Sequence, residues 1–298
     1  MNLSHLSDQE IKETLVLKQR LQLLEKQKDC QDSFLNYVEH MWPEFICGRH
    51  HKIFAQKLED VANGKINRLI INMPPRHTKS EFCSTYFPAW IMGKQPNRKI
   101  MQTTHTGELA VRFGRKVRNM MDTDEYKRIF TEVELQADSK SAGRWETNKG
   151  GEYFAAGVGG AITGRGADLL IIDDPHSEQD ALSPSALESC WEWYTSGPRQ
   201  RLQPGGAIIL VMTRWSSIDL TAKLLDAQQE EAADQWEIVE FPAIFPETNN
   251  ALWPEFWAID ELNKVKASLP VQKWNAQWMQ NPTSEEGSII KREWWNMW

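Results

Sequence analysis

Two short stretches of the sequence end in residue types that could bind phosphate and a divalent metal. Residues 69–81 read Leu-Ile-Ile-Asn-Met-Pro-Pro-Arg-His-Thr-Lys-Ser-Glu, an apolar run followed by a turn with a lysine and a serine. Residues 168–175 read Asp-Leu-Leu-Ile-Ile-Asp-Asp-Pro, a second apolar run that ends in two carboxylates. A lysine and a hydroxyl after one strand, with an acid after another, are the groups that hold a nucleoside triphosphate and Mg²⁺. In this order the two stretches predict a P-loop ATPase that binds ATP and Mg²⁺.

The first stretch departs from the G-x-x-x-x-G-K-[ST] pattern, because Met73 and Thr78 stand at its two glycine positions. Glycine lets the backbone turn its N–H groups toward phosphate without steric cost, so the shape of this loop is open to question. A strand–turn–helix connection that carries Lys-Ser by chance is the alternative for this stretch taken alone. We expect the loop to contact the nucleotide through Pro75, Arg76, His77, Thr78, Lys79, Ser80 and Glu81.

Distinct roles are expected within the loop and the paired acids. Lys79 would contact the β- and γ-phosphates, and Arg76 would add a second positive group. Ser80 and Asp173 would bind Mg²⁺, while Asp174 would polarise the attacking water.

The second acid is one methylene shorter than the glutamate that is usual at this position. His176 and Glu178 are therefore kept as weaker alternatives for the role of base. Without the lysine upstream, Asp-Asp-Pro would be interpreted as a solvated turn after a strand.

Composition restricts the class of protein. The chain has 298 residues and a net charge of −7, from 41 acidic and 34 basic residues, which argues against a permanent nucleic-acid coat. No run approaches the roughly 20 apolar residues of a membrane span, and residues 1–9 do not resemble a signal peptide. The four cysteines are scattered without a C-x-x-C pair. We expect a soluble chain, without membrane contact, in a reducing cytosol.

Apolar runs alternate with helical patterns along the middle of the chain. This alternation predicts an α/β fold with a mostly parallel central sheet covered by helices on both faces, as in RecA-like ATPases with an added strand. The expected strands are Arg68–Asn72, Lys99–Thr104, Gly150–Gly160, Leu169–Asp173, Ala207–Thr213 and Trp236–Phe241.

Three regions are expected: an N-terminal helical segment (1–49), an ATPase core (50–245) and a lid or linker region (246–298). The first helix, opened by Ser7 and Glu10 and extending to about Lys28, is expected to lie solvated on the domain rather than to bind a partner. Seven of the fourteen tryptophans fall between residues 253 and 298. Those at 294, 295 and 298 either pack back on the domain or belong to a longer chain.

Four stretches, in order, resemble the large terminase subunit of tailed bacteriophages, over about residues 50–298. The resemblance implies an ATPase motor that drives viral double-stranded DNA into a procapsid. It further implies a homo-oligomeric ring, a pentamer, docked on the portal protein, a small terminase subunit as partner, and action in the host cytoplasm and transiently at the portal vertex. The nuclease half of the family is not part of these residues, so no nuclease activity is expected. The four stretches are residues 74–81, 163–175, 193–202 (Trp-Tyr-Thr-Ser-Gly-Pro-Arg-Gln-Arg-Leu) and 211–215 (Val-Met-Thr-Arg-Trp).

The resemblance also implies roles outside the loop and the acids. Thr213 and Arg214 would couple hydrolysis to the rest of the fold. The segment that contacts adenine would be the stretch around His50, His51 and Phe54.

An arginine finger is expected from a neighbouring subunit, with Arg165 as first candidate and Arg112 and Arg115 behind it. The two arginines share one helix with Lys116 and Arg118. That basic face is either a solvated surface, a DNA contact or a contact with the neighbouring subunit.

Two other functions remain open at this point. A helicase core would need a second motor unit, and 298 residues without a second NTP-binding pattern argue against it. A nucleotide-binding scaffold with weak hydrolysis is kept open by the two missing glycines and by Asp174. Measuring ATPase activity with and without DNA would separate the three functions.

Overall fold

The centre of the computed structural model, which describes residues 8–162 and 164–283, is one eight-stranded sheet with the order β3-β4-β5-β2-β6-β7-β1-β8. The strands from β5 to β8 in this order are all parallel, and the hairpin β3–β4 adds two antiparallel strands at one edge. The predicted fold class is confirmed, whereas the hairpin was not predicted. The strands are β1 (Arg68–Asn72), β2 (Lys99–Thr104), β3 (Leu135–Lys140), β4 (Arg144–Thr147), β5 (Glu152–Gly157), β6 (Ala167–Asp173), β7 (Leu202–Met212) and β8 (Glu237–Glu240).

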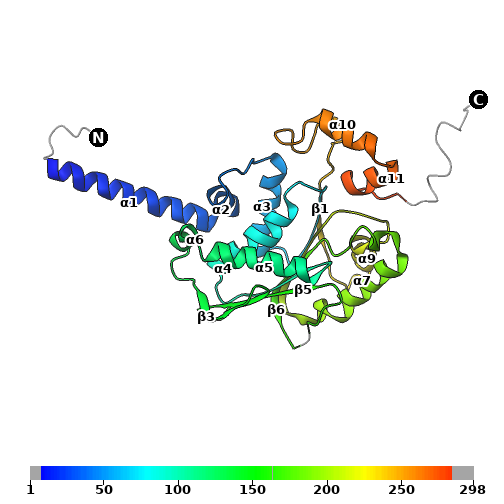
Figure 1. Ribbon diagram of the computed structural model, residues 1–298, viewed down its shortest axis with the longest axis horizontal. Helices are drawn as coiled ribbons and strands as arrows, with labels where there is room; N and C mark the ends of the chain where they lie inside the picture. Colours follow the sequence, from blue (N-terminus) through cyan, green and yellow to red (C-terminus); the bar gives the residue numbers. More distant parts are fainter. Residues whose placement is uncertain (1–7, 163, 284–298) are drawn as a thin grey trace, which may run out of the picture.

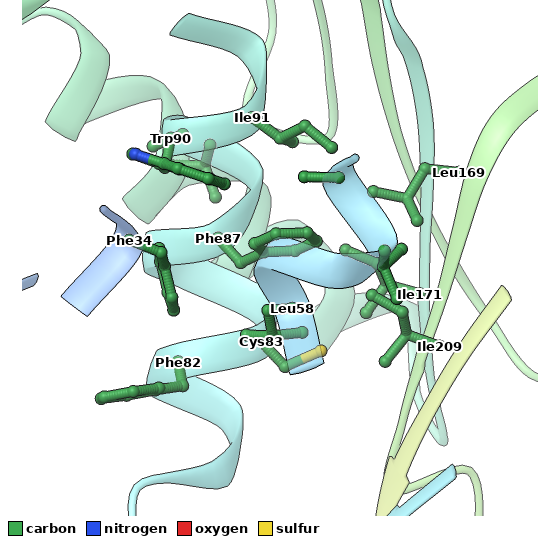
Figure 2. Close-up of a cluster of buried hydrophobic side chains, with 14 of the residues drawn as sticks. Phe34, Leu58, Phe82, Cys83, Phe87, Trp90, Ile91, Leu169, Ile171 and Ile209 are labelled. Carbon is green, nitrogen blue, oxygen red and sulfur yellow. The ribbon is translucent and has the colours of Figure 1, made fainter. Parts of the chain in front are cut away.

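Alternate residues of the central strands face two separate cores. Odd-numbered residues such as Leu169, Ile171 and Ile209 face the first core, shown in Figure 2, where they lie opposite Phe87 and Leu58. All five of these side chains are fully buried, which explains why the strands read as continuous apolar runs. The helices on this side are α2 (Phe34–Met41), α3 (Arg49–Ala62), α4 (Phe87–Lys94), α5 (Gly107–Met121) and α6 (Asp124–Ile129).

In β1, β6 and β7 the even-numbered residues, among them Leu170, Ile172 and Ile208, face the second core, whereas in β2 the odd-numbered Met101 does so. They pack against Tyr194 of α7 (Pro184–Ser196) and Leu224 of α9 (Leu220–Ala227). The sheet is therefore covered on both faces, so its strand ends are the natural place for a site. Two short helices, η2 (Asp180–Leu182) and α8 (Pro198–Arg201), flank α7.

The helix that follows the loop begins with a wider turn. Residues Glu81–Tyr86 form a π-helix (η1), in which the Phe87 N–H bonds to the Phe82 carbonyl, and α4 continues without a break. Pro88 has no N–H to donate, and its ring would clash with the carbonyl four residues earlier in an α-helix, so the wider turn accommodates it. Pro88 therefore lies within the helix, which extends to Lys94.

The first helix, α1 (Asp8–Asp32), extends away from the body of the molecule (Figure 1). Only its C-terminal end is anchored, where the side-chain amides of Gln27 and Gln31 donate to the Ile129 carbonyl and Trp90 Nε1 donates to the Cys30 carbonyl. The expectation that this helix lies on the domain is wrong for most of its length. Its exposed apolar side chains are Leu15, Val16, Leu17, Leu21, Leu23 and Leu24, and the expected capping residue Ser7 lies outside the described residues.

A small third core follows β8. Ile244, Leu262 and Trp274 are among its buried side chains, contributed by the loop after β8, by α10 (Ile259–Ser268) and by η3 (Trp274–Trp278), which continues α11 (Val271–Lys273). We refer to residues 243–281 as the C-terminal unit. The tryptophans at 294, 295 and 298 lie outside the described residues. Across the described ranges, no helix is long and apolar enough to cross a membrane.

Candidate nucleotide-binding site

The loop and the paired acids meet at one edge of the sheet. The loop follows β1, the acids end β6, and both strands pair with β7 between them. Lys79 Nζ lies 2.8 Å from Asp174 Oδ2, and Ser80 Oγ donates to Asp173 Oδ1 over 3.0 Å. The fold thus brings together four of the predicted site residues: the lysine for phosphate, the serine and aspartate for metal, and the second aspartate for the attacking water.

The loop has left-handed backbone positions without glycine. Arg76 has a φ of 61° and Thr78 a φ of 66°, and Asp174 across the site has a φ of 43°. Left-handed conformations cost roughly 1–2 kcal/mol for residues with a Cβ, and more is expected for a β-branched residue. Thr78 therefore adopts the turn conformation that a glycine would adopt, but its Cβ leaves backbone strain in the loop.

Asp173 is buried in a network of hydroxyl groups. It accepts hydrogen bonds from Ser80 and, over 2.7 Å, from Ser84 Oγ, which in turn accepts one from Gln102 Nε2. Burial and the neighbouring Asp174 raise the pKa of Asp173 well above its usual range, while Lys79 and the two serines oppose the shift. Sequence analysis missed Ser84 and Gln102, although Ser84 lies one turn after Ser80.

The second acid is held from two sides. Asp174 Oδ1 accepts a hydrogen bond of 2.9 Å from the Thr213 N–H, while Oδ2 pairs with Lys79. Thr213 Oγ1 also donates to the Met73 carbonyl at the start of the loop. The predicted coupling residue Thr213 therefore contacts both the acid and the loop.

Arg214, the other predicted coupling residue, is buried and bound to other groups. Its guanidinium Nε lies 3.0 Å from Asp219 Oδ2, and its backbone N–H donates to Gln280 Oε1 over 3.1 Å. Asp219 caps helix α9, and Gln280 belongs to the C-terminal unit. Arg214 thus links the tip of β7 to two neighbouring elements.

The two alternative bases are occupied. His176 is buried and its Nε2 accepts a hydrogen bond from the Leu220 N–H, with burial lowering the pKa of the ring. Glu178 forms an ion pair with Lys273. Asp174, in contrast, pairs with Lys79 of the loop.

A cavity of about 450 Å³ extends from the loop to an aromatic wall. Its polar end is lined by Arg76, Thr78, Lys79, Ser80 and Glu81. Its other end is lined by Trp42, Glu44, Phe45, Ile46, Trp253 and Phe256. Sequence analysis missed the aromatic wall, and its only signal was the density of tryptophan after residue 253.

The segment expected to contact adenine lies behind this wall. His51 and Phe54 are fully buried, and neither lines the cavity. The His51 ring packs against Phe45, Phe82 and Trp253. The expected direct contact of His51 with the nucleotide is therefore corrected, because the aromatic wall separates the ring from the cavity.

Two loop residues also turn away from the cavity. The buried His77 ring bonds through Nδ1 to the Pro75 carbonyl and lies near Trp257 and Trp278 of the C-terminal unit. Trp257 Nε1 donates to the Arg76 carbonyl over 3.4 Å. The His77 ring and the Arg76 carbonyl thus connect the loop to the C-terminal unit, and neither Pro75 nor His77 lines the cavity.

The finger candidates lie apart from the loop. Arg165 precedes β6, at the opposite end of the strand from Asp173, where it donates to Glu152 Oε1 over 2.6 Å and lies 4.3 Å above the Phe154 ring. On α5, Arg112 and Arg115 are exposed or half-buried at the surface. The other two residues of that basic face have partners, since Lys116 pairs with Glu81 at the cavity and Arg118 bonds to Asn119.

The oxygen atoms present suit Mg²⁺ rather than a soft metal. Among the described residues no group of three or more His, Cys, Asp or Glu could hold a metal ion. Ser80 and Asp173 supply two oxygen ligands, and Mg²⁺ normally combines one or two such groups with water and phosphate oxygens.

Comparison with known proteins relates this fold to phage packaging proteins. No protein-family model and no curated protein matches the sequence. The large terminase of bacteriophage HK97 superposes with a TM-score of 0.52 at 14% identity, covering 85% of this chain and 55% of that protein. The large terminase of a thermophilic bacteriophage in complex with ADP superposes with a TM-score of 0.45 at 12% identity. That superposition covers 75% of this chain and 53% of that protein. The ATPase domain of the Thermus phage P74-26 large terminase superposes with a TM-score of 0.45 at 13% identity. That superposition covers 74% of this chain and 90% of that domain.

The HK97 superposition is the one that supports a conclusion about the fold. The chain spans about half the length of the HK97 protein and of the thermophilic phage protein, so it corresponds to one part of them. The resemblance first seen in four sequence stretches is confirmed at the level of the fold: the chain has the fold of about half of the HK97 large terminase.

Proposed function

We propose that the chain is the ATP-hydrolysing motor part of a large terminase, which drives double-stranded viral DNA into a procapsid. The observation that carries this proposal is the convergence of the two aspartates on Lys79 and Ser80, which line the polar end of one cavity. In a chain with the terminase fold, this is the set of groups that phosphoryl transfer requires.

In the proposed site the loop receives the phosphates. Lys79 and Arg76 supply positive charge at the polar end of the cavity, and Ser80 with Asp173 would hold Mg²⁺. The metal, when bound, neutralises charge on the phosphate oxygens. Lys79 pairs with Asp174, so binding of ATP would draw Lys79 toward the γ-phosphate and release Asp174 Oδ2.

The released carboxylate would then orient the attacking water. Its other oxygen stays fixed by the Thr213 N–H, so the acid keeps its position when Lys79 leaves. Loss of the γ-phosphate would restore the Lys79–Asp174 pair. Thr213 joins this exchange to the tip of β7, from which Arg214 connects to Gln280 of the C-terminal unit.

The aromatic end of the cavity would hold the base. Phe45 and Phe256 come from distant parts of the chain and line this end of the cavity, and Phe256, which stacks on the buried Trp253, is 55% exposed and would offer its ring to the base. The wall thereby joins residues from before β1 to the C-terminal unit. We retain the division into residues 1–49, 50–245 and 246–298 as part of this proposal.

The partners proposed are double-stranded DNA, the portal protein of the procapsid, the small terminase subunit and further copies of this chain in a ring, a pentamer when docked. Action would take place in the host cytoplasm and transiently at the portal vertex. A finger from a neighbouring copy would complete the site, with Arg165 first and Arg112 or Arg115 next. Arg76, which lines the cavity of its own chain, is the alternative in cis.

Steady-state ATPase measurements with Mg²⁺ or EDTA, and with or without double-stranded DNA, test the proposed function. We expect Mg²⁺-dependent hydrolysis that is slow in dilute solution and rises with protein concentration, since a finger in trans contributes roughly 10³–10⁵ in rate in related enzymes. Arg165→Ala should remove the rise. Nucleotide binding without hydrolysis under all conditions would favour a scaffold, and strand separation would favour a helicase.

A further inference from the structure

Thr78 has a backbone conformation that its side chain disfavours. Its φ of 66° lies in the left-handed region, where a β-branched residue is a genuine outlier. Thr78 directly precedes Lys79 and lines the cavity. The contacts that hold Thr78 in this conformation therefore also fix the position of the Lys79 backbone.

A hydrogen-bonded chain ties the Thr78 side chain to helix α3. His51 Nε2 lies 2.7 Å from Thr78 Oγ1, and Thr78 Oγ1 donates to the His77 carbonyl over 2.6 Å. At the other side of the ring, Nδ1 accepts from the Gly48 N–H over 2.8 Å. Because Nδ1 accepts and the hydroxyl proton is already used, Nε2 must carry the ring proton and donate it to Thr78.

The ring that provides this donor is rigidly held. His51 lies in the first turn of α3, and its ring packs between Phe45, Phe82 and Trp253 at centroid distances of 4.7, 5.0 and 4.9 Å. Gly48 allows the start of α3 to lie close to the Trp253 ring, since a Cβ on Gly48 would lie 2.6 Å from Trp253 Cδ1. Burial lowers the pKa of His51 to about 2, so the ring stays neutral and its tautomer stays fixed.

We infer that His51 is a positioning residue for the phosphate loop, holding Thr78 in the left-handed conformation that a glycine would adopt without support. The inference deepens the proposed function, since it concerns the same site. His51 touches neither the cavity nor the predicted reacting atoms, so its effect passes through Thr78. This loop thus replaces the freedom of a glycine with a hydrogen bond from a neighbouring helix.

A double-mutant cycle tests this inference. The affinity for a fluorescent ADP analogue with Mg²⁺ is measured for wild type, His51→Ala, Thr78→Gly and the double variant. We expect His51→Ala to weaken binding about tenfold when Thr78 is present and less than about twofold in the Thr78→Gly background, because glycine adopts this φ without a tether. Equal losses in both backgrounds would overturn the inference and leave His51 as a packing residue.

Substitutions at Thr78 test the same point without altering the histidine. Thr78→Val keeps the branched shape and removes the hydroxyl, so it should bind the analogue at least about fivefold more weakly than Thr78→Gly. Equal or tighter binding by the valine variant would contradict a role for the hydroxyl. This comparison decides the matter even if His51→Ala does not fold.

Two further variants separate positioning from burial. His51→Gln places an amide donor near the position of Nε2 and should restore at least half of the lost affinity on a logarithmic scale. His50→Ala removes the neighbouring buried histidine, whose ring does not bond to Thr78, and should show the same loss in both backgrounds. Failure of glutamine to restore any affinity, or coupling of equal size at His50, would count against the tether.

Failure of the proposed function can be told apart from failure of this inference. If wild type binds no nucleotide, the proposed function fails. The same four proteins are then compared by the midpoint temperature of thermal unfolding. A larger downward shift for His51→Ala with Thr78 than with Thr78→Gly supports the tether, and equal shifts overturn it.

Discussion

The two ends of the cavity are built by different physical means. At the phosphate end, charged groups such as Lys79 and Asp174 are placed by the ends of strands that pair in one sheet. At the base end, Phe45 and Trp253 are joined by packing between segments more than 200 residues apart in sequence. The first end depends on a rigid sheet and strong local charge, and the second depends on the C-terminal unit staying in place.

This difference separates the expected functions of the two ends. Charge close to the phosphates acts on the transition state, so its loss should lower turnover. Flat aromatic faces bind the base equally in substrate and transition state, so their loss should raise KM and leave kcat largely intact. Substitutions at each end test this division between turnover and affinity.

Removal of the loop lysine should have the largest effect. Lys79→Ala should lower hydrolysis by at least about 10³-fold and weaken nucleotide binding, because the buried cation beside Asp173 and Asp174 is lost. The measurement is steady-state ATPase activity with an ADP binding titration. Lys65→Ala removes an exposed lysine paired with Asp60 and serves as control. Turnover near wild type in Lys79→Ala would show that the loop has been misassigned.

The two acids should separate binding from turnover. Asp174→Asn should keep Mg-ATP bound and lower turnover by about 10²–10⁴-fold, since the water loses its base while the metal ligand stays. Asp173→Asn should instead raise the Mg²⁺ concentration needed for half-maximal activity. Magnesium titrations of binding and hydrolysis distinguish the two. Equal loss of binding in both variants would show that the roles are confused.

The base end should respond in affinity alone. Phe256 lines the cavity and is 55% exposed, so Phe256→Ala removes a stacking face at little cost to folding. Stacking on an aromatic side chain contributes roughly 1–3 kcal/mol per base, so we expect ADP to bind about fivefold to 150-fold more weakly. Tripolyphosphate, which lacks a base, should bind as before. Val271→Ala, an exposed position of the same unit, is the matched control.

Weaker binding of tripolyphosphate by Phe256→Ala would contradict the division between the two ends. It would show that the C-terminal unit acts on the loop itself, through the contacts of Trp257 with Arg76 and His77.

What could be predicted from sequence follows the same division. Strands and their polar ends are local patterns, and the parallel sheet then brings Lys79 and Asp173 together without further information. Ser84 and Gln102 were missed because a buried polar residue within a helix or strand looks like any other until its partner is known. Trp253 could not be placed at the cavity, because that position arises only from packing of the C-terminal unit on α3.

The segment expected to contact adenine and the residues that line the cavity are neighbours in sequence but not the same residues. The stretch before β1 does border the cavity, but through Trp42 and Phe45 rather than His51. Helix α3 turns His51 inward, where its polarity serves Thr78. The helical spacing of His51 with Phe54, Ala55 and Leu58 places His51 on the buried face of α3, and this was the signal in the sequence that could have shown its orientation.

The smallest effect concerns the histidines behind the aromatic wall. Burial lowers the pKa of His50 to about 3, with His77 nearby, and that of His51 to about 2, with His50 and His77 nearby. Burial also lowers the pKa of His77 to about 4. The folded chain keeps these rings neutral at pH 5–7, whereas the unfolded chain protonates them below about pH 6.5. The unfolded state therefore binds more protons, and the free energy of unfolding should fall as pH drops from 6.5, by up to ~1.4 kcal/mol per pH unit for each ring.

Asp173 opposes this trend, because its raised pKa lets the folded state take up a proton in the same range. The two contributions can be separated by urea unfolding between pH 5 and pH 7. His50→Leu removes one titrating ring and should make the dependence on pH shallower, so that the variant gains stability relative to wild type as pH falls. Asp173→Asn should make the dependence steeper. If the pH profile of His50→Leu runs parallel to that of wild type, burial does not keep these histidine rings neutral. The tautomer assigned to His51, which requires a neutral ring, would then be contradicted.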